Sequence, residues 1–253
     1  MTRTVTKHTR FYMDGYDLSG YSRSVGPLEV TFDTAEDAAF TDEVKNVLPG
    51  QANVNIGTLN GYFDNTASTG LHVVASGAGV IRNVMVPIGF LTAPAAGDPV
   101  FLGQYEQQTY MQEGDLNSYV TMGFGGWSGS ASTLLYNKPW GYLLHAKGAE
   151  TAVNTAVGLD DRGASTSLGG FFAYQIFSSN GTVTVKAQDA STNTNVSFSD
   201  LSGATSGSVD ASSAPKHGIV ALSTTATIRR YTRWQIVFGT ATTVTFAAAL
   251  VRI

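Results

Sequence analysis

The sequence contains no cysteine in its 253 residues, which excludes a disulfide framework and any thiolate metal site. Charged residues are also scarce: they make up 13% of the chain, about half of the usual ~25%. A chain of this length buries enough apolar surface to fold. The surface of the folded protein should therefore carry few charged side chains. Such a surface is typical of a protein that is covered by copies of itself, although an ordinary stable β-domain shares the composition.

Long apolar runs are absent as well. No stretch approaches 18 uninterrupted apolar residues, so we expect no membrane span. The N-terminal sequence MTRTVTKHTR lacks the apolar centre of a secretion signal. We therefore expect a protein that is made and kept in a cytoplasm, with no membrane partner.

The sequence offers no recognisable catalytic or cofactor motif. It has no Gly-x-Gly-x-x-Gly or Walker-type loop, and Gly126–Ser130 departs from Gly-x-Ser-x-Gly because Ser130 stands at its last position. Asp160-Asp161 beside Arg162 predicts a solvated turn. The four histidines lie far apart in the sequence, which argues against a metal site: His8, His72, His145 and His217. We predict no catalytic residues, no cofactor, no metal and a non-enzymatic function.

Charge is distributed unevenly along the chain. Residues 14–64 carry nine acidic side chains against Arg23 and Lys45, whereas residues 215–253 carry five basic side chains and no acid. Residues 1–13 are also basic. Two explanations stay open: the opposite charges pair inside one fold, or they form complementary faces that meet between subunits.

Most of the chain has the alternating pattern of β-strands, which predicts an all-β fold of about a dozen strands. Asn180-Gly181 predicts a hairpin between strands at 171–177 and 182–188, with Val183, Val185 and Ala187 facing the core. Asp14–Gly20 predicts a tight turn, with Asx-type side-chain bonding at Asp14 and Asp17. Residues 228–238 predict another strand, with residues 244–250 as its partner. Leu71–Ala75 also predicts a strand. The stretches Gly123–Ser130 and Ser199–Pro215 predict loops.

One short helix is predicted in the acidic segment. Apolar residues at helical spacing favour a helix from about Asp37 to Asn46, which Pro49-Gly50 would end. A strand with a glycine bulge at Gly57 would then follow from Gln51 to Phe63.

The domain organisation is predicted from a change of composition. Residues 147–170 are small and polar, and they are the predicted connector. This divides the chain into a first β domain at 1–146, which includes the short helix, and a second β half at 171–253.

Three short motifs in the first quarter of the chain resemble one known family. They are DGYDLSGY (Asp14–Tyr21), LPG (Leu48–Gly50) and GYFD (Gly61–Asp64). In this order they resemble the major tail protein, or tail tube protein, of long-tailed bacteriophages.

The resemblance implies a tail-tube-type β-sandwich or barrel with one short α-helix, followed by a second β-sandwich half. It also implies a structural virion protein whose copies form three- or six-fold rings. The rings would stack into a tube, bind other tail proteins and let DNA pass without specific binding. The second half would be a duplicated tube domain or an outer decoration. The expected location is the virion tail, assembled in the host cytoplasm.

The two strongest features of opposite charge form our hypothesis for the subunit interface. Its residues are Asp33, Glu36, Asp37, Asp42, Glu43, Arg229, Arg230 and Arg233. Interleaved arginine and aromatic residues can also bind nucleic acid, but the overall acidity of the chain argues against that function. Two further alternatives are a carbohydrate-binding β-sandwich, favoured by tyrosine and tryptophan near polar loops, and a capsid or fibre component.

Overall fold

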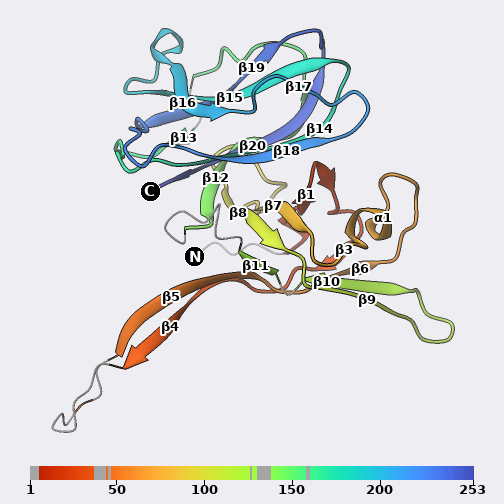
Figure 1. The fold of residues 1–253 in the computed structure, drawn as a ribbon. Helices are drawn as coiled ribbons and strands as arrows, with labels where there is room; N and C mark the ends of the chain where they lie inside the picture. The colour runs from red at the N-terminus through yellow and green to blue at the C-terminus, as the bar shows by residue number, and fades with distance from the viewer. Residues whose placement is uncertain (1–5, 37–43, 45–46, 126, 130–137, 158–159) are drawn as a thin grey trace.

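The computed structural model describes residues 6–36, 44, 47–125, 127–129, 138–157 and 160–253. The fold is almost entirely β, as the alternating pattern predicts, with one short α-helix, α1 (Leu71–Ala75), in the described part (Figure 1). The first ten strands are β1 (Tyr12–Met13), β2 (Tyr16–Asp17), β3 (Ser22–Ser24), β4 (Leu28–Glu36), β5 (Val47–Ile56), β6 (Leu59–Tyr62), β7 (Ile81–Pro87), β8 (Pro99–Glu106), β9 (Thr109–Glu113) and β10 (Thr121–Gly125). The others are β11 (Trp127–Gly129), β12 (Trp140–Glu150), β13 (Asp160–Asp161), β14 (Gly170–Ser179), β15 (Thr182–Ala190), β16 (Ser199–Thr205), β17 (Val209–Asp210), β18 (Lys216–Ala221), β19 (Tyr231–Phe238) and β20 (Val244–Arg252).

The described strands form three sheets. The largest has 11 strands, in the order β18-β14-β20-β12-β8-β11-β5-β4, with β7, β1 and β2 joined to its β8 side. A four-stranded sheet has the order β3-β6-β10-β9, and a five-stranded sheet contains β13, β19, β15, β16 and β17. The largest sheet runs through both halves of the chain because β12 pairs with β8 on one side and with β20 on the other. The division into 1–146, 147–170 and 171–253 stays a prediction, and the two halves share this sheet.

The second half is a β-sandwich. Its five-stranded sheet packs over the part of the large sheet formed by β18, β14, β20 and β12 (Figure 1). The predicted inward positions of β15 are fully buried in the core between the two layers. They are Val183, Val185 and Ala187.

The predicted hairpin at Asn180-Gly181 is wrong, although both of its strands exist. β14 pairs with β18 and β20, whereas β15 pairs with β16, β17 and β19, so the two residues connect opposite layers of the sandwich. Neither has the positive φ of the expected turn. The side-chain oxygen of Asn180 instead accepts hydrogen bonds from the backbone of Thr242 and Thr243, in the connection between β19 and β20. That connection also crosses between layers, so the predicted pairing of β19 with β20 is wrong for the same reason.

β14 and β20 are buried on both faces. One face contributes to the sandwich core, and the other packs against residues of the first half such as Tyr12, Met85 and Leu102. Burial on both faces accounts for their nearly continuous apolar sequences, FFAYQIF and FAAALV. The two halves are therefore joined by a shared core as well as by a shared sheet.

The helix of the described chain lies at a position where we predicted a strand. The β-branched Val73 and Val74 favour extended structure, but Leu71, Val74 and Ala75 have the i, i+3, i+4 spacing of a helix face. These three residues are buried in the core of the first half, so packing overrides the local preference.

The predicted helix at 37–46 lies outside the described residues, apart from Val44. Its predicted stop at Pro49-Gly50 is wrong, because both residues lie inside β5 and Gly50 does not have a positive φ. β5 pairs with β4 along its length, whereas its other side pairs with β11 only at Asn55 and Ile56. A proline is tolerated where one side of a strand has no partner.

Two predicted loops contain strands. Residues 199–215 form β16 and β17, which pair with β15. In the stretch 123–130, β10 ends at Gly125 and β11 pairs with both β5 and β8. The small residues of this stretch lie in paired strands rather than in a loop.

Candidate functional site

The most distinctive surface feature is a long two-stranded ribbon that leaves the body of the molecule (Figure 1). We call it the projecting arm: Thr31–Glu36 of β4 and Val47–Ala52 of β5. Residues 31–35 and 47–51 are all exposed. β4 is an end strand of the large sheet, so its outer edge pairs with no strand in the described part of the chain. An open strand edge of this kind is a template for pairing with another chain.

An apolar stripe runs from the core onto the arm. Directly opposite pairs of the ribbon share one face: Leu28 with Ile56, Val30 with Val54, and Phe32 with Ala52. At the base, Val54 and Ile56 are buried in the core, whereas Phe32 is 52% exposed. Further out, the register shift after Phe32 places Val47 on this face, opposite Glu36, and Val47 is 48% exposed. The stripe therefore continues beyond the body, where no described residue of this chain covers it.

A second hairpin, β9–β10, extends from the other side of the first half (Figure 1). Tyr119, in the loop of this hairpin, is 80% exposed and its ring packs edge-on against Tyr62, at 5.7 Å between centroids. Leu116 in the same loop is 94% exposed. This hairpin presents a smaller apolar surface than the arm.

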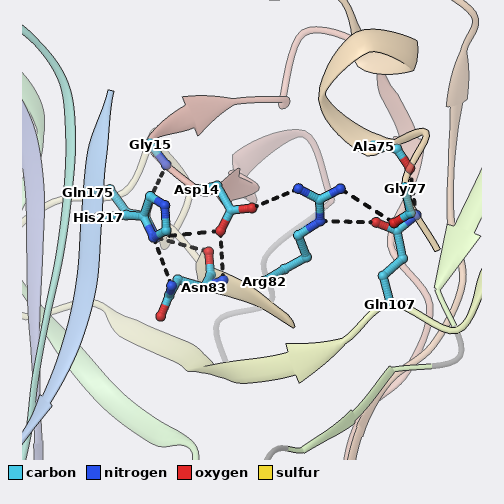
Figure 2. Close-up of polar contacts among 9 residues, drawn as sticks. All are labelled: Asp14, Gly15, Ala75, Gly77, Arg82, Asn83, Gln107, Gln175 and His217. Carbon is cyan, nitrogen blue, oxygen red and sulfur yellow. Dashed lines mark hydrogen bonds and ion pairs between the residues drawn. The ribbon is translucent and has the colours of Figure 1, made fainter. Parts of the chain in front are cut away.

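The two halves meet at a polar cluster around the turn between β1 and β2, shown in Figure 2. Asp14 and Gly15 form this two-residue turn, and both have a positive φ, 51° and 82°. The Asp14 carboxylate pairs with Arg82 at 3.1 Å and accepts the backbone N–H of Asn83 at 2.8 Å. A side chain at Gly15 would meet Pro215 of the second half at 2.5 Å, so glycine is required there.

Gln175 of β14 connects the second half to this turn. Its side-chain oxygen accepts the backbone N–H of Gly15 at 2.5 Å, and its amide donates to the carbonyl of Asn83 at 3.1 Å. Gln175 is only 1% exposed. The motif residues Asp14 and Gly15 are thus positioned to orient one half against the other. The Asx-type turn predicted at Asp17 is confirmed, because its carboxylate accepts the N–H of Ser19 at 3.0 Å.

His217 of β18 lies on the second-half side of the same cluster. Its Nδ1 accepts a hydrogen bond from the side-chain amide of Asn83 at 2.8 Å. Gln104 donates to the other end of that amide, so the NH₂ group faces His217. Burial lowers the pKa of His217; the neighbouring Arg82 and Lys216 lower it further, and Asp14 opposes them. This network requires the neutral imidazole.

We expect the stability of the protein to fall as the pH falls from about 7 to about 5. Because the pKa of His217 is lower in the folded state, the unfolded chain binds a proton first below about pH 6.5, and the free energy of unfolding decreases. The pKa of His145 is also lowered by burial and adds to the slope. His217→Gln keeps an acceptor for Asn83 and should make the slope shallower in urea unfolding measured across this range. Equal slopes would show that His217 does not contribute.

The three arginines of the interface hypothesis have partners within residues 156–200 of the same chain. Arg229 pairs with the buried Asp189 at 2.9 Å, and Arg230 makes two hydrogen bonds to Asp161, at 2.6 and 2.7 Å. The Arg230 guanidinium lowers the pKa of Asp161 to about 2.

Arg233 differs from the other two because it is only 6% exposed. It donates to the side chains of Gln188 and Asn195 and to the carbonyl of Ala156. Burial lowers its pKa. Arg233 is therefore a structural residue of the sandwich, whereas Arg229 and Arg230 reach its surface.

The acidic partners of the hypothesis lie on or beyond the arm. Asp33 is exposed on β4, and Glu36 ends that strand. Asp37, Asp42 and Glu43 lie outside the described residues. In the described part of the chain, no contact joins these acids to the three arginines, so their meeting between subunits stays a prediction.

The predicted solvated turn at Asp160-Asp161 is wrong for its first residue. Asp160 is 4% exposed, pairs with Arg162 and accepts the Thr232 hydroxyl at 2.6 Å. Burial raises its pKa, which the bonds to Thr232 and Arg162 oppose. The described residues contain no group of three or more histidine, aspartate or glutamate side chains that could hold a metal ion. Among them, no helix is long and apolar enough to cross a membrane.

No family model and no curated protein matches the sequence. Among solved structures, the chain is similar to Dit (gp 19.1) of phage SPP1, described as a paradigm of the hub adsorption apparatus in phages that infect Gram-positive bacteria. The match covers 96% of this chain and 98% of that chain at 10% identity, with a TM-score of 0.33. So low a score does not establish a shared fold, and the function proposed for this chain rests on its own residues.

Proposed function

We propose that this chain is a structural subunit of a phage tail, and that its copies assemble into rings that stack into the tail tube. The projecting arm carries the proposal. It exposes an open strand edge together with an apolar stripe that continues out of the core. A two-stranded ribbon is only marginally stable in water by itself, so an arm of this kind gains stability when another chain covers it.

The motifs that resemble tail tube proteins support the same proposal. Two of them have structural roles in the first half. Asp14–Tyr21 includes the turn in the polar cluster where the two halves meet. Gly61 packs so closely on Tyr21 and Leu71 that a side chain at this position would meet them at 2.7 Å. The third, Leu48–Gly50, lies on the arm. In the proposed tube, DNA passes through the lumen without specific binding, and other tail proteins bind the ends.

The proposal is tested on the purified full-length chain. We expect sedimentation to show self-association across micromolar concentrations and negative-stain images to show rings or tubes. The proposal would be contradicted if the protein is monomeric at every concentration and if labelling of this protein in the native particle locates it outside the tail. Labelling of the capsid or of fibres would instead favour the alternative of a capsid or fibre component.

We also propose that the acidic residues of the arm region meet Arg229 and Arg230 of a neighbouring subunit. Arg230 is the more exposed of the two, with 43% of its side chain accessible. Assembly should slow at high salt, because the screening length falls to about 3 Å at 1 M. Arg230→Glu should slow it at low salt as well.

Asp161→Asn is the control, because it removes the partner of Arg230 within the chain and leaves the arginine charged. This variant should assemble at least as fast as the wild type. If Arg230→Glu assembles at the wild-type rate in both salts, Arg230 takes no part in the interface.

A further inference from the structure

The sandwich contains a pocket that the assembly proposal does not use. It has a volume of about 400 Å³ and lies between the inner faces of β12 and β19, where the segment Pro94–Ala96 of the first half closes one side. Strand residues of both layers and two loops line it, and His145, Glu150 and Trp234 are the ones that matter for its chemistry. A volume of this size is typical of a site for a small ligand.

One wall of the pocket is a rigid aromatic group. The His145 ring stacks on Phe246 with 4.1 Å between centroids, and Trp234 packs edge-on against both, at 4.6 and 5.5 Å. Because two rings fix it, the indole of Trp234 has little freedom to rearrange. Its N–H donates no hydrogen bond to any residue that the structure describes, and the side chain is only partly buried.

The other wall supplies an acceptor. One carboxylate oxygen of Glu150 contacts His145 Nε2 at 3.0 Å, and the side chain is 31% exposed. The second oxygen has no partner among the described residues. His145 Nδ1 faces the carbonyl oxygen of Phe246 at 3.1 Å. Burial lowers the pKa of His145, which favours its neutral imidazole.

Other polar side chains of the pocket are engaged within the chain. Asp160 is paired with Arg162 and Thr232, and the hydrogen bonds of Arg233 go to other residues of this chain. The side chain of Asn154 donates to the carbonyl of Trp234 and accepts from Ala156. Glu150 and Trp234 therefore offer a free acceptor and a free donor beside an aromatic surface.

We propose that this pocket binds a neutral saccharide. A sugar hydroxyl can donate to the free oxygen of Glu150, another can accept from the Trp234 N–H, and the C–H face of a pyranose can lie against the aromatic wall. An ammonium ligand would satisfy Glu150 but could not accept from the indole. An anion would have its negative charge beside the Glu150 carboxylate. This inference is independent of tube assembly, since the pocket lies within one chain.

The test is saturation-transfer NMR on the full-length chain with the methyl glycosides of glucose, galactose and N-acetylglucosamine as probes. We expect at least one to bind with a dissociation constant of about 1 mM. Glu150→Gln keeps the shape of the side chain and should weaken binding by at least about tenfold. Trp234→Phe keeps a ring but removes the N–H donor and should weaken binding by several-fold.

Two matched controls carry the same changes outside the pocket. Glu113→Gln on β9 and Trp140→Phe at the start of β12 should leave binding unchanged, and thermal unfolding should show that all four variants are folded. The proposal is overturned if none of the glycosides binds. It is also overturned if both pocket variants bind like the wild type, or if methylammonium or inorganic phosphate binds in place of the sugars.

Discussion

Replacing residues 33–51 with Asn-Gly is expected to abolish assembly and leave a folded monomer. Phe32 and Ala52 are directly opposite each other, so a two-residue turn can close the shortened ribbon at that pair. The removed residues of known exposure lie almost entirely in water. The free energy of unfolding should therefore change by less than about 1 kcal/mol. Urea unfolding measures the stability, and sedimentation with negative-stain imaging measures the assembly.

A finer variant tests the apolar stripe itself. Phe32→Asp with Val47→Asp should raise the concentration needed for assembly by at least about 30-fold, because an anchor residue buried at an interface typically contributes about 2 kcal/mol or more. Leu168→Asp is the matched control: Leu168 is 56% exposed but lies in the segment 147–170, just before β14 and outside the arm. If the arm variants assemble normally, the arm is not the interface.

Gln175→Ala is expected to give the largest loss of stability of any single change considered. The substitution leaves the N–H of Gly15 and the carbonyl of Asn83 without their partner at a buried site, and it also creates a cavity. Each unsatisfied group costs about 1–3 kcal/mol, so we expect a loss of about 3 kcal/mol or more. Urea unfolding of the monomer provides the measurement.

Gln112→Ala, on the exposed strand β9, is the control and should change stability by no more than about 0.5 kcal/mol. A loss of less than about 1 kcal/mol for Gln175→Ala would mean that water replaces both hydrogen bonds. The polar cluster between the two halves would then contribute less to the stability of the protein than its geometry suggests.

Local patterns in the sequence predicted the fold class well. The alternation in β15 placed Val183, Val185 and Ala187 correctly in the core, and the Asp17 turn formed as its side chain predicts. These features depend on residues that are close together in the sequence. For the same reason the short turn at Asp14-Gly15 was recognisable before its partners were known.

Pairing between distant segments was not predictable in this way. Asn180-Gly181 has the composition of a hairpin turn, but the strands on either side find better partners in β18, β20 and β19. The polar cluster between the two halves was not predicted, because it depends on a contact between Gln175 and Gly15, which are 160 positions apart in the sequence. A polar residue within the apolar run FFAYQIF was the available signal, since a buried glutamine requires partners.

The same physical limit applies to the arginine strand. Charge segregation along the sequence suggested that Arg229, Arg230 and Arg233 meet the acidic segment, which stays a prediction, but it gave no sign that Asp189 and Asp161 pair with Arg229 and Arg230 within the chain. Charges pair with whatever the fold brings near, and total charge per segment does not contain that information. Arg233 is the only one of the three arginines that is buried, and this burial identifies it as a structural residue.

The position of β20 has a consequence for how the protein is made. Residues 244–252 occupy the middle of the large sheet, between β14 and β12, and they complete two cores at once. During synthesis these residues leave the ribosome after the arm, so the arm emerges on a chain whose body is still open. A chain interrupted before residue 244 would lack the strand that completes both cores, so we expect it not to form the body described here.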